Sequence, residues 1–464
     1  MIPGISNTKA LISNVPGTFV VEANGTKFYV SVKFINDRGQ SKVINKNEFS
    51  ELSFESVYTS PFVMGRLQLI EIDQQNKLKP GSYQFSGSGG EFIHIKIQQQ
   101  LGARADNRIT ILNHKFIVKN IVETTTGKNI PMLNYYFADI EFGALSYNRL
   151  PWSTVNMLSN GAQLNENNKK VYVSDAISNL LTSFCKNENY DIIDTNNWDP
   201  SSTRIEYTLH HNQSPLTALH DLMSSYVSRK DKNMGLLLRQ GGKFKLLSLD
   251  SIFKHAPTPI ASVMIHNNDN RTYYTNNQDS TYFSRRYQMI PVHISDVQYY
   301  PKNPDTAVDV VVDHSIISYD SKNKGFNIYN QPGSITNLKN TFNDILLPFP
   351  GSQRKEVDVD KSNITKPNKN LTCIHESSNN SEFLGKSALQ YKLINSADRI
   401  SFNIPGSFLP SGGKFIGIEL TGLPMNPIMK NMSGSWFVLQ STTTLAQNGF
   451  RTFLVNAKLD KQKL

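Results

Sequence analysis

The amino-acid sequence predicts a mainly β protein in which two antiparallel β-barrel domains flank a small α+β domain. Three observations support this prediction. Short apolar runs with period two recur in the first and last thirds of the chain, as half-buried strands require. Apolar residues at helical spacing are concentrated in the middle third. The 464 residues include 25 Phe and 19 Tyr, and aromatic side chains suit pleated sheets.

The first predicted domain spans residues 1–149, in a chain whose length is that of roughly three domains. Asn24-Gly25 stands between two apolar runs and is a two-residue turn signal of the kind that closes hairpins. Six or more strands with turn residues between them predict one antiparallel sandwich or barrel. We expect strands at 18–22, 27–32, 51–55, 66–72, 91–97 and 115–119.

An α+β middle domain is predicted over residues 171–255, after a polar linker at 150–170. Ser174 is a good N-cap for a first helix, whose apolar residues recur at helical spacing. Pro215 opens a second helix at the first helical position, where its missing N–H costs nothing. A hairpin closed by two glycines follows, so we expect two helices packed on a small sheet.

The second barrel is predicted from two segments of the chain. Residues 256–319 return strands to it, and residues 384–464 form its C-terminal part. Residues 320–383 between them are polar and irregular, and a segment of this length predicts a mobile insertion or arm. The stretch 384–395 is compatible with a helix. Strands are expected at 298–300, 307–312, 399–404, 413–420, 435–439 and 451–458.

The chain is basic, with a net charge of +10 and a pI near 9.2. A nucleic-acid-binding protein concentrates such charge in a patch or stripe. Lys and Arg are instead scattered singly along this sequence, and the densest clusters, at 228–232 and 458–463, are modest. We interpret the charge as a solvated basic surface.

The two cysteines, Cys185 and Cys373, cannot form a disulfide framework or a multi-cysteine metal site. Free thiols fit a protein that folds in a reducing cytoplasm. The first residues lack the charged and apolar regions of a signal peptide. No apolar run approaches the roughly 20 residues that span a bilayer. These features predict a protein made in the cytoplasm without a membrane span.

No group of residues predicts a catalytic, cofactor-binding or metal site. His210, His211, His220 and Asp221 are close in sequence. However, His211 and His220 lie on either side of a helix start and lack a helical metal-ligand spacing. A surface histidine cluster is the simpler interpretation.

Three other motifs also have simple structural interpretations. Cys373-x-His375-Glu376 lies in the irregular segment, where pre-organised catalytic groups are least expected. The Gly-x-Gly-Gly motif at 87–90 lacks the lysine and hydroxyl of a phosphate-binding loop and precedes a strand. Trp198, beside a turn dipeptide, predicts a core anchor. We therefore expect no enzyme and no cofactor, although a glycosidase needs only two well-placed carboxylates.

Two ordered series of short motifs have a further implication. The first is Asn197-Trp198-Asp199-Pro200, Ile205-Glu206-Tyr207, Ser214-Pro215-Leu216-Thr217-Ala218-Leu219 and Ser225-Tyr226-Val227-Ser228, followed by the hairpin strand at 243–249. The second is Ile404-Pro405-Gly406, the strand at 412–420, Ser433-Gly434-Ser435-Trp436-Phe437-Val438 and Arg451-Thr452-Phe453-Leu454-Val455. In this order they resemble the middle domain and the second barrel of central baseplate hub proteins from contractile-tailed phages. The first domain fits the first hub barrel by architecture only, and residues 320–383 have no counterpart.

The resemblance implies a structural protein of the virion and no enzymatic activity. Such hubs are homotrimers in which two barrels per subunit alternate around a ring, and the ring adapts a hexameric tail tube to a trimeric spike. The implied partners are further copies of the chain, tail-tube or tube-initiator proteins, the central spike protein and baseplate wedge proteins. The implied location is the baseplate of a contractile tail.

Two alternatives stay open on the sequence. A polysaccharide- or receptor-binding tail module would expose aromatic platforms, whereas most aromatic residues here alternate with polar ones as core positions do. A tail-associated cell-wall hydrolase would show a cleft with two carboxylates of different pKa.

Overall fold

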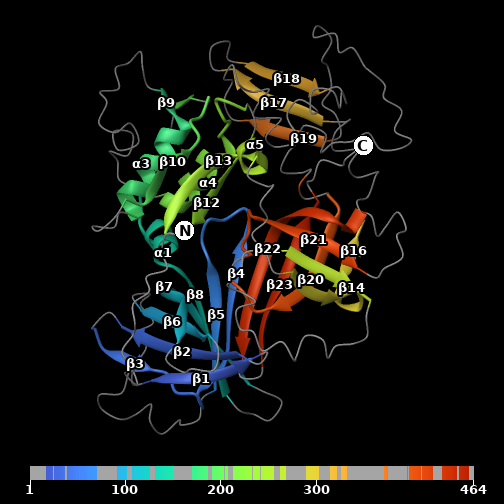
Figure 1. The fold of residues 1–464 in the computed structure, drawn as a ribbon. Helices are drawn as coiled ribbons and strands as arrows, with labels where there is room; N and C mark the ends of the chain where they lie inside the picture. Colours follow the sequence, from blue (N-terminus) through green and yellow to red (C-terminus); the bar gives the residue numbers. More distant parts are fainter. Residues whose placement is uncertain are drawn as a thin grey trace.

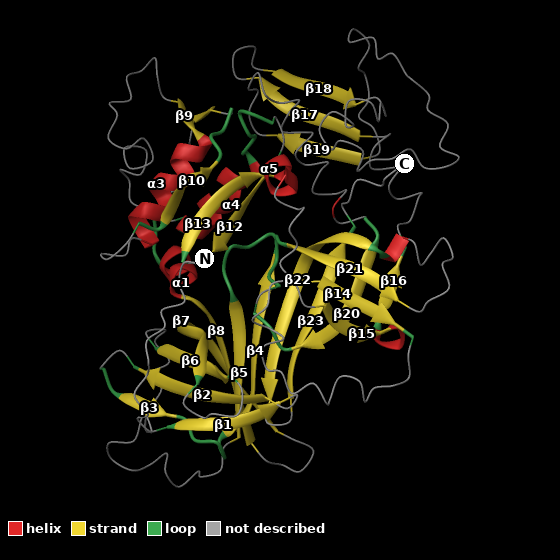
Figure 2. Ribbon diagram, in the orientation of Figure 1, coloured by secondary structure: helices red, strands yellow, loops and turns green. Residues whose placement is uncertain are grey.

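The computed structural model has three connected parts: two curved β regions and one part with helices packed on a small sheet (Figure 1). Strands dominate (Figure 2), so the predicted fold class, mainly β with an α+β middle region, is confirmed. The structure describes residues 17–23, 26–36, 39–70, 91–101, 107–125, 131–150, 170–185, 191–202, 204–206, 213–231, 234–240, 242–254, 262–267, 289–301, 314–320, 325–331, 370–374, 394, 397–408, 410–421, 431–446 and 449–458.

The N-terminal part is an antiparallel sheet. Its strands are β1 (Thr18–Ala23), β2 (Thr26–Ile35), β3 (Ser41–Val43), β4 (Phe49–Val57), β5 (Met64–Ile70), β6 (Phe92–Gln100), β7 (Arg108–Thr125) and β8 (Pro131–Asp139). They pair in the order β1-β2-β6-β7-β8-β5-β4, with β3 also on β2. Buried and partly exposed residues alternate strictly along β2 and β6, so one face of the sheet forms the core. All six strands predicted in this region are present.

The C-terminal part continues the same sheet. Its strands are β14 (Ser262–His266), β15 (Met289–His293), β16 (Gln298–Tyr300), β20 (Arg399–Pro405), β21 (Phe415–Thr421), β22 (Gly434–Ala446) and β23 (Gly449–Ala457), with the 3-10 helix η4 (Ile294–Asp296). The sequence predicts an antiparallel barrel here. The pairing is instead mixed, because β14 is parallel to both β15 and β21. Long connections join these strands, and only such connections permit parallel pairing.

One strand, β22, belongs to both β parts. Its first residues pair with β21, and residues 440–446 pair with β4. The partner changes beside an irregularity in the β22–β23 ladder between Val438 and Gln440, and such bulges bend a strand and increase its twist. β1 also lies against β23, and β15 against β20. Both parts therefore curl back on themselves, although no closed sheet forms among the described residues.

The middle part packs helices on a small sheet. Its elements are α1 (Ile140–Tyr147), β9 (Lys170–Tyr172), α3 (Val173–Cys185), β10 (Ile193–Trp198), β11 (Arg204–Glu206), α4 (Pro215–Ser224), β12 (Gly235–Gln240), β13 (Lys243–Ser248) and α5 (Leu249–Lys254). The three sheet strands pair in the order β10-β13-β12. α4 begins as predicted, because Thr217 N–H donates to the Ser214 hydroxyl at 3.2 Å and Pro215 follows the cap.

Three local predictions need correction. α1 lies where only strands were expected. The sequence gives no sign of this helix, because it has a glycine, Gly143, in its middle and no side-chain cap. That glycine is required, since a Cβ there would lie 2.9 Å from Ile117. Ser174 is inside α3 and not its N-cap. Its backbone N–H donates to Ser201 Oγ, and its own hydroxyl accepts from Ser201 N–H.

Part of the segment predicted to be irregular forms strands. β18 (Gly325–Gln331) and β19 (Asn370–Ile374) lie in it, and they pair with β17 (His314–Asp320) in a three-stranded sheet of order β18-β17-β19. β17 was predicted to belong to the second barrel, but it pairs with no strand of the large sheet among the described residues. Asparagine is a poor strand former, and three asparagines within and beside β18 obscured its pattern. The rest of the predicted arm, the strand at 307–312, most of the stretch 384–395 and linker residues 151–169 lie outside the described residues.

Candidate functional site

The first domain and the middle domain meet at the end of β8, where the chain enters α1. Asp139, the last residue of β8, is 3% exposed and precedes the helix. Its Oδ2 accepts a hydrogen bond from Val63 N–H at 2.7 Å, and its own N–H donates to Val63 O at 3.0 Å. The backbone after β4 therefore holds this carboxylate in place.

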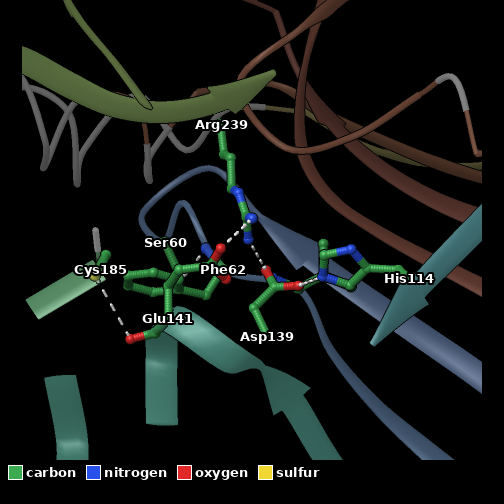
Figure 3. A network of polar contacts seen from close by, with 8 residues as sticks. Ser60, Phe62, His114, Asp139, Glu141, Cys185 and Arg239 are labelled. Atoms are coloured by element: carbon green, nitrogen blue, oxygen red, sulfur yellow. Dashed lines mark hydrogen bonds and ion pairs between the residues drawn. The ribbon is translucent and has the colours of Figure 1, made fainter. Parts of the chain in front are cut away.

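Arg239 reaches this carboxylate from the middle domain. It lies near the end of β12, and its guanidinium lies between Asp139 and Glu141 (Figure 3). Nη1 is 3.1 Å from Asp139 Oδ2, and Nη2 is 2.7 Å from Glu141 Oε1. The arginine side chain is only 11% exposed, so water weakens these ion pairs less than it weakens pairs on the surface. We call this set of residues, with His114, the Arg239 network.

His114 faces Asp139 from the other side. Its Nε2 lies 2.9 Å from Asp139 Oδ1. This nitrogen is nevertheless buried without a hydrogen-bond partner in the described part of the chain, as is Glu141 Oε2. The distance suits an ion pair, but the ring is not oriented for a hydrogen bond. The two carboxylates of Asp139 and Glu141 therefore face one arginine.

An aromatic contact lies beside the network. Phe62, between β4 and β5, is buried and belongs to the hydrophobic core of the middle domain. Its ring packs edge-on against Phe142 of α1 and Phe244 of β13, at centroid distances of 5.7 and 5.8 Å. The first domain thus contributes both an apolar side chain and a charged group to this junction.

The donor set of the network also has metal-ligand chemistry. One atom each of His114, Asp139 and Glu141 lies within 4.8 Å of the others, and imidazole with carboxylates suits several divalent metals. Arg239 already supplies positive charge to both carboxylates, however, and would repel a cation placed there. The geometry favours a salt-bridge network, and the expectation of no metal-ligating residue stays a prediction.

The thiol of Cys185 closes one side of the junction. It is buried at the end of α3 and lies 3.9 Å from the Glu141 carbonyl oxygen. Burial, and then the negative charge of Glu141, raise the pKa of Cys185 to about 12. Only the thiolate is a nucleophile or metal ligand, so this cysteine is inert while the junction is closed.

The structure describes only some of the residues that the sequence placed in candidate motifs. His220 and Asp221 are exposed on α4, and Asp221 accepts from Gln213 Nε2 at 2.8 Å. Cys373 is a residue of β19. His210, His211, His375, Glu376 and the glycine motif at 87–90 lie outside the described residues.

The motif residues of the middle domain have structural roles. Trp198 packs against the core, as predicted. Asp199 Oδ2 accepts Ser248 N–H at 2.7 Å, and Tyr226 OH donates to the Asp199 carbonyl at 2.9 Å. Hydrogen bonds therefore join the turn at Asp199-Pro200 to the segment that follows α4 and to the end of the hairpin.

Two motif residues of the C-terminal part, Trp436 and Thr452, are buried. Trp436 is fully buried and donates from Nε1 to Met432 O at 2.9 Å. The Thr452 hydroxyl accepts Ser407 N–H at 2.8 Å and donates to Ser407 O at 2.9 Å. Thr452, on the strand β23, is thus hydrogen-bonded to the segment that follows β20.

Sequence reasoning missed the Arg239 network entirely. Its members come from β7, β8, α1 and β12, and no motif links them along the chain. The detectable signal was Asp139-Ile140-Glu141, in which two acids flank an apolar residue at the end of a strand. No helix among the described residues is long and apolar enough to cross a membrane.

Comparisons with known proteins find similarity to solved structures only. No protein-family model matches the chain, and a search of curated proteins finds no match. Solved structures of tail proteins are similar over most of its length. A tail protein from Neisseria meningitidis has a TM-score of 0.47 at 12% identity, covering 92% of this chain and 96% of that one. The 43 kDa tail protein of prophage MuSo2 from Shewanella oneidensis has a TM-score of 0.47 at 9% identity, covering 93% and 97%.

A third similar structure is the E. coli c3393 protein, described as a component of the type VI secretion system with structural similarity to the T4 tail proteins gp27 and gp5. Its TM-score is 0.39 at 7% identity, covering 88% of this chain and 73% of that one. These TM-scores are below 0.5 and the identities are low, so the likenesses do not assign a function to this chain.

Proposed function

We propose that this chain is a structural tail protein, the central hub of a contractile-tail baseplate. In this proposal three copies form a ring, and the ring adapts a hexameric tube to a trimeric spike. The work is mutual burial of surface, with no covalent step. The α+β domain lies beside the ring, and the segment 320–383 reaches a neighbouring subunit.

The observation that carries the proposal is the sharing of β22 by the two curved parts of one sheet. Residues 440–446 pair with β4 in the N-terminal part, while the start of β22 pairs with β21 in the C-terminal part. Each chain therefore presents two curved β units in a fixed relation. Three copies around a closed axis would present six such units, which is the number that a six-fold tube requires.

The shared strand also has a packed interface that fixes this relation. Phe450 of β23 packs against Phe28 of β2 at 4.8 Å and against Phe408 at 5.7 Å. Gln440 Nε2 donates to Glu55 Oε1 at 2.7 Å, and Gly412 N–H donates to Ser56 Oγ at 3.1 Å. A ring of such subunits could not change its geometry by hinging between the two β units.

The test is the mass of the purified chain in solution, together with electron microscopy of the particles. The expected result is a species of three times the 52.3 kDa chain mass, seen as a ring with a central channel. Where the chain alone is a monomer, co-expression with the adjacent tube and spike proteins is the deciding arm. A complex with one copy of this chain per spike trimer would overturn the proposal.

The same preparation tests the absence of enzymatic activity. Purified protein is incubated with cell-wall material and with isolated polysaccharide, and soluble products are measured. We expect none. Release of fragments by a monomer would favour the hydrolase and contradict the hub.

A further inference from the structure

The β-sheet register gathers lysines that are scattered in the sequence. Lys33 of β2, His94 of β6 and Lys115 of β7 lie side by side in one row across three strands. Lys96 of β6 lies in the next row, between Ser31 and Asn113. Diagonal neighbours in such a sheet are roughly 7–8 Å apart. The side chains next to them along β2 and β6, such as Val32 and Ile95, are fully buried, so these lysines lie on the outer face.

This outer face of β2, β6 and β7, which we call the basic face, is unbalanced in charge. Lys27 and Arg108 extend it at one end, and Glu22 is paired with Lys27 at 3.4 Å. Lys33, Lys96 and Lys115 form no ion pair with the acidic groups that the structure describes. Lys96 is a diagonal neighbour of both Lys33 and Lys115, so three like charges lie close together on this face.

The aromatic rings on the basic face are covered by its own cations. The Arg108 guanidinium carbon lies 3.4 Å from the centroid of the Tyr29 ring, and Lys115 Nζ lies 4.0 Å from that of Phe92. Tyr29 OH is also held by Gln100 at 3.1 Å. Single-stranded nucleic acid is bound through bases that stack on open rings, and these two rings are not open.

The composition of the face also distinguishes between possible partners. Interfaces between proteins are depleted of lysine and centre on aromatic or apolar anchors. Here Lys96 and His94 lie at the centre, and Lys33 and Lys115 flank His94. The other neighbours are neutral hydrogen-bonding side chains such as Asn113, whose Oδ1 lies 2.9 Å from His94 Nε2. Protein–DNA interfaces are polar and much more positively charged. We propose that the basic face binds the phosphate backbone of duplex DNA, without reading its sequence.

The proposal differs from the solvated basic surface that the sequence indicates, and it is independent of the hub function. Each lysine would contact one phosphate as a point charge. Binding would therefore fall with salt, with a slope near −0.9 on logarithmic axes for each phosphate contacted. Different duplex sequences would bind alike.

The experiment measures binding of the whole chain to a fluorescent duplex of about 30 base pairs by anisotropy, between about 50 and 200 mM salt. The variant K33Q/K96Q/K115Q should reduce the steepness of the salt slope by about 3 and weaken binding at least tenfold at the low salt. The control K230Q/K243Q/R149Q removes the same charge from exposed positions elsewhere and should leave the slope unchanged. Thermal unfolding tests whether both variants are folded. If K33Q/K96Q/K115Q is not folded, the single variant K96Q is used in its place.

Three results would overturn the proposal. One is an absence of binding to duplex at low salt. Another is equal weakening by both triple variants, which would show a response to net charge alone. The third is equal competition by polyglutamate, which would show that the face accepts an acidic protein as readily as DNA.

Discussion

The first domain is joined to the C-terminal β part and to the middle domain in two different ways. The difference indicates which of the two joints is more sensitive to a change of charge. The β4–β22 seam consists of a backbone ladder over an aromatic core that contains Leu445 and Phe450 together with residues of the first domain. Among the described residues the junction to the middle domain has no such ladder. It consists of side-chain packing at Phe62, the charges of the Arg239 network, and an apolar cluster in which Tyr58 of the first domain joins Met234 and Leu236 of the middle domain. We therefore expect loss of a core residue at the seam to destabilise the chain more than loss of one charge at the junction.

The largest effect is expected at the seam. Phe450→Ala removes a fully buried ring that contacts both β parts, and such a change costs about 3–5 kcal/mol. Phe453→Ala, on the same strand but 37% exposed, is the matched control and should change stability little. Chemical denaturation of both variants measures the difference. Equal effects would mean that the seam is not a core.

A smaller effect is expected at the junction. Arg239→Ala leaves Asp139 and Glu141 without their cation and should cost about 2–3 kcal/mol, because buried charged groups lose their partner. Arg66→Ala breaks a more exposed pair with Glu51 and should cost less than about 1 kcal/mol. Denaturation midpoints measure both. If D139N/E141Q in the Arg239→Ala background restores no stability, the network is not electrostatic.

The Cys185 thiol reports on opening of the same junction. Its pKa is raised on folding, so the stability linked to its proton is present below the ordinary thiol pKa and is lost as pH rises toward about 12. In the wild-type protein at pH 8 we expect slow alkylation of this cysteine. Arg239 lowers the pKa of Cys185, so its removal by itself would slow alkylation, whereas opening of the junction would speed it. We expect opening to dominate in Arg239→Ala and to raise the rate severalfold, measured by mass spectrometry of the peptide that contains Cys185. A slower rate would show that the junction stays closed without its arginine.

The smallest effect is expected within the middle domain, away from both joints. Ser214→Ala removes the N-cap of α4 and should cost about 1 kcal/mol. Ser214→Asp keeps an acceptor at this position and should keep most of the stability. Thermal unfolding distinguishes the two, and equal losses would contradict the cap.

The sequence predicts features that depend on neighbours along the chain and misses those that depend on register. The strands of the first domain and the cap at Ser214 follow from local patterns, and the structure confirms them. Parallel pairing of β14 depends on partners far away in sequence. The basic face arises in the same way, because Lys33, Lys96 and Lys115 become neighbours only through pairing. Glu141 could not be connected to Arg239 by any spacing rule, and α1 was hidden by its glycine.

The shared strand β22 also determines when the first domain can be completed during synthesis. Gln440 and Glu55, which hydrogen-bond across the seam, are 385 residues apart. β4 therefore lacks its β22 partner until a segment 385 residues further along the chain has been made. Contacts so distant in sequence slow folding, and an unpaired strand edge attracts other chains in the meantime. The unpaired edge of β4 is thus the point at which the newly made chain most needs protection from aggregation.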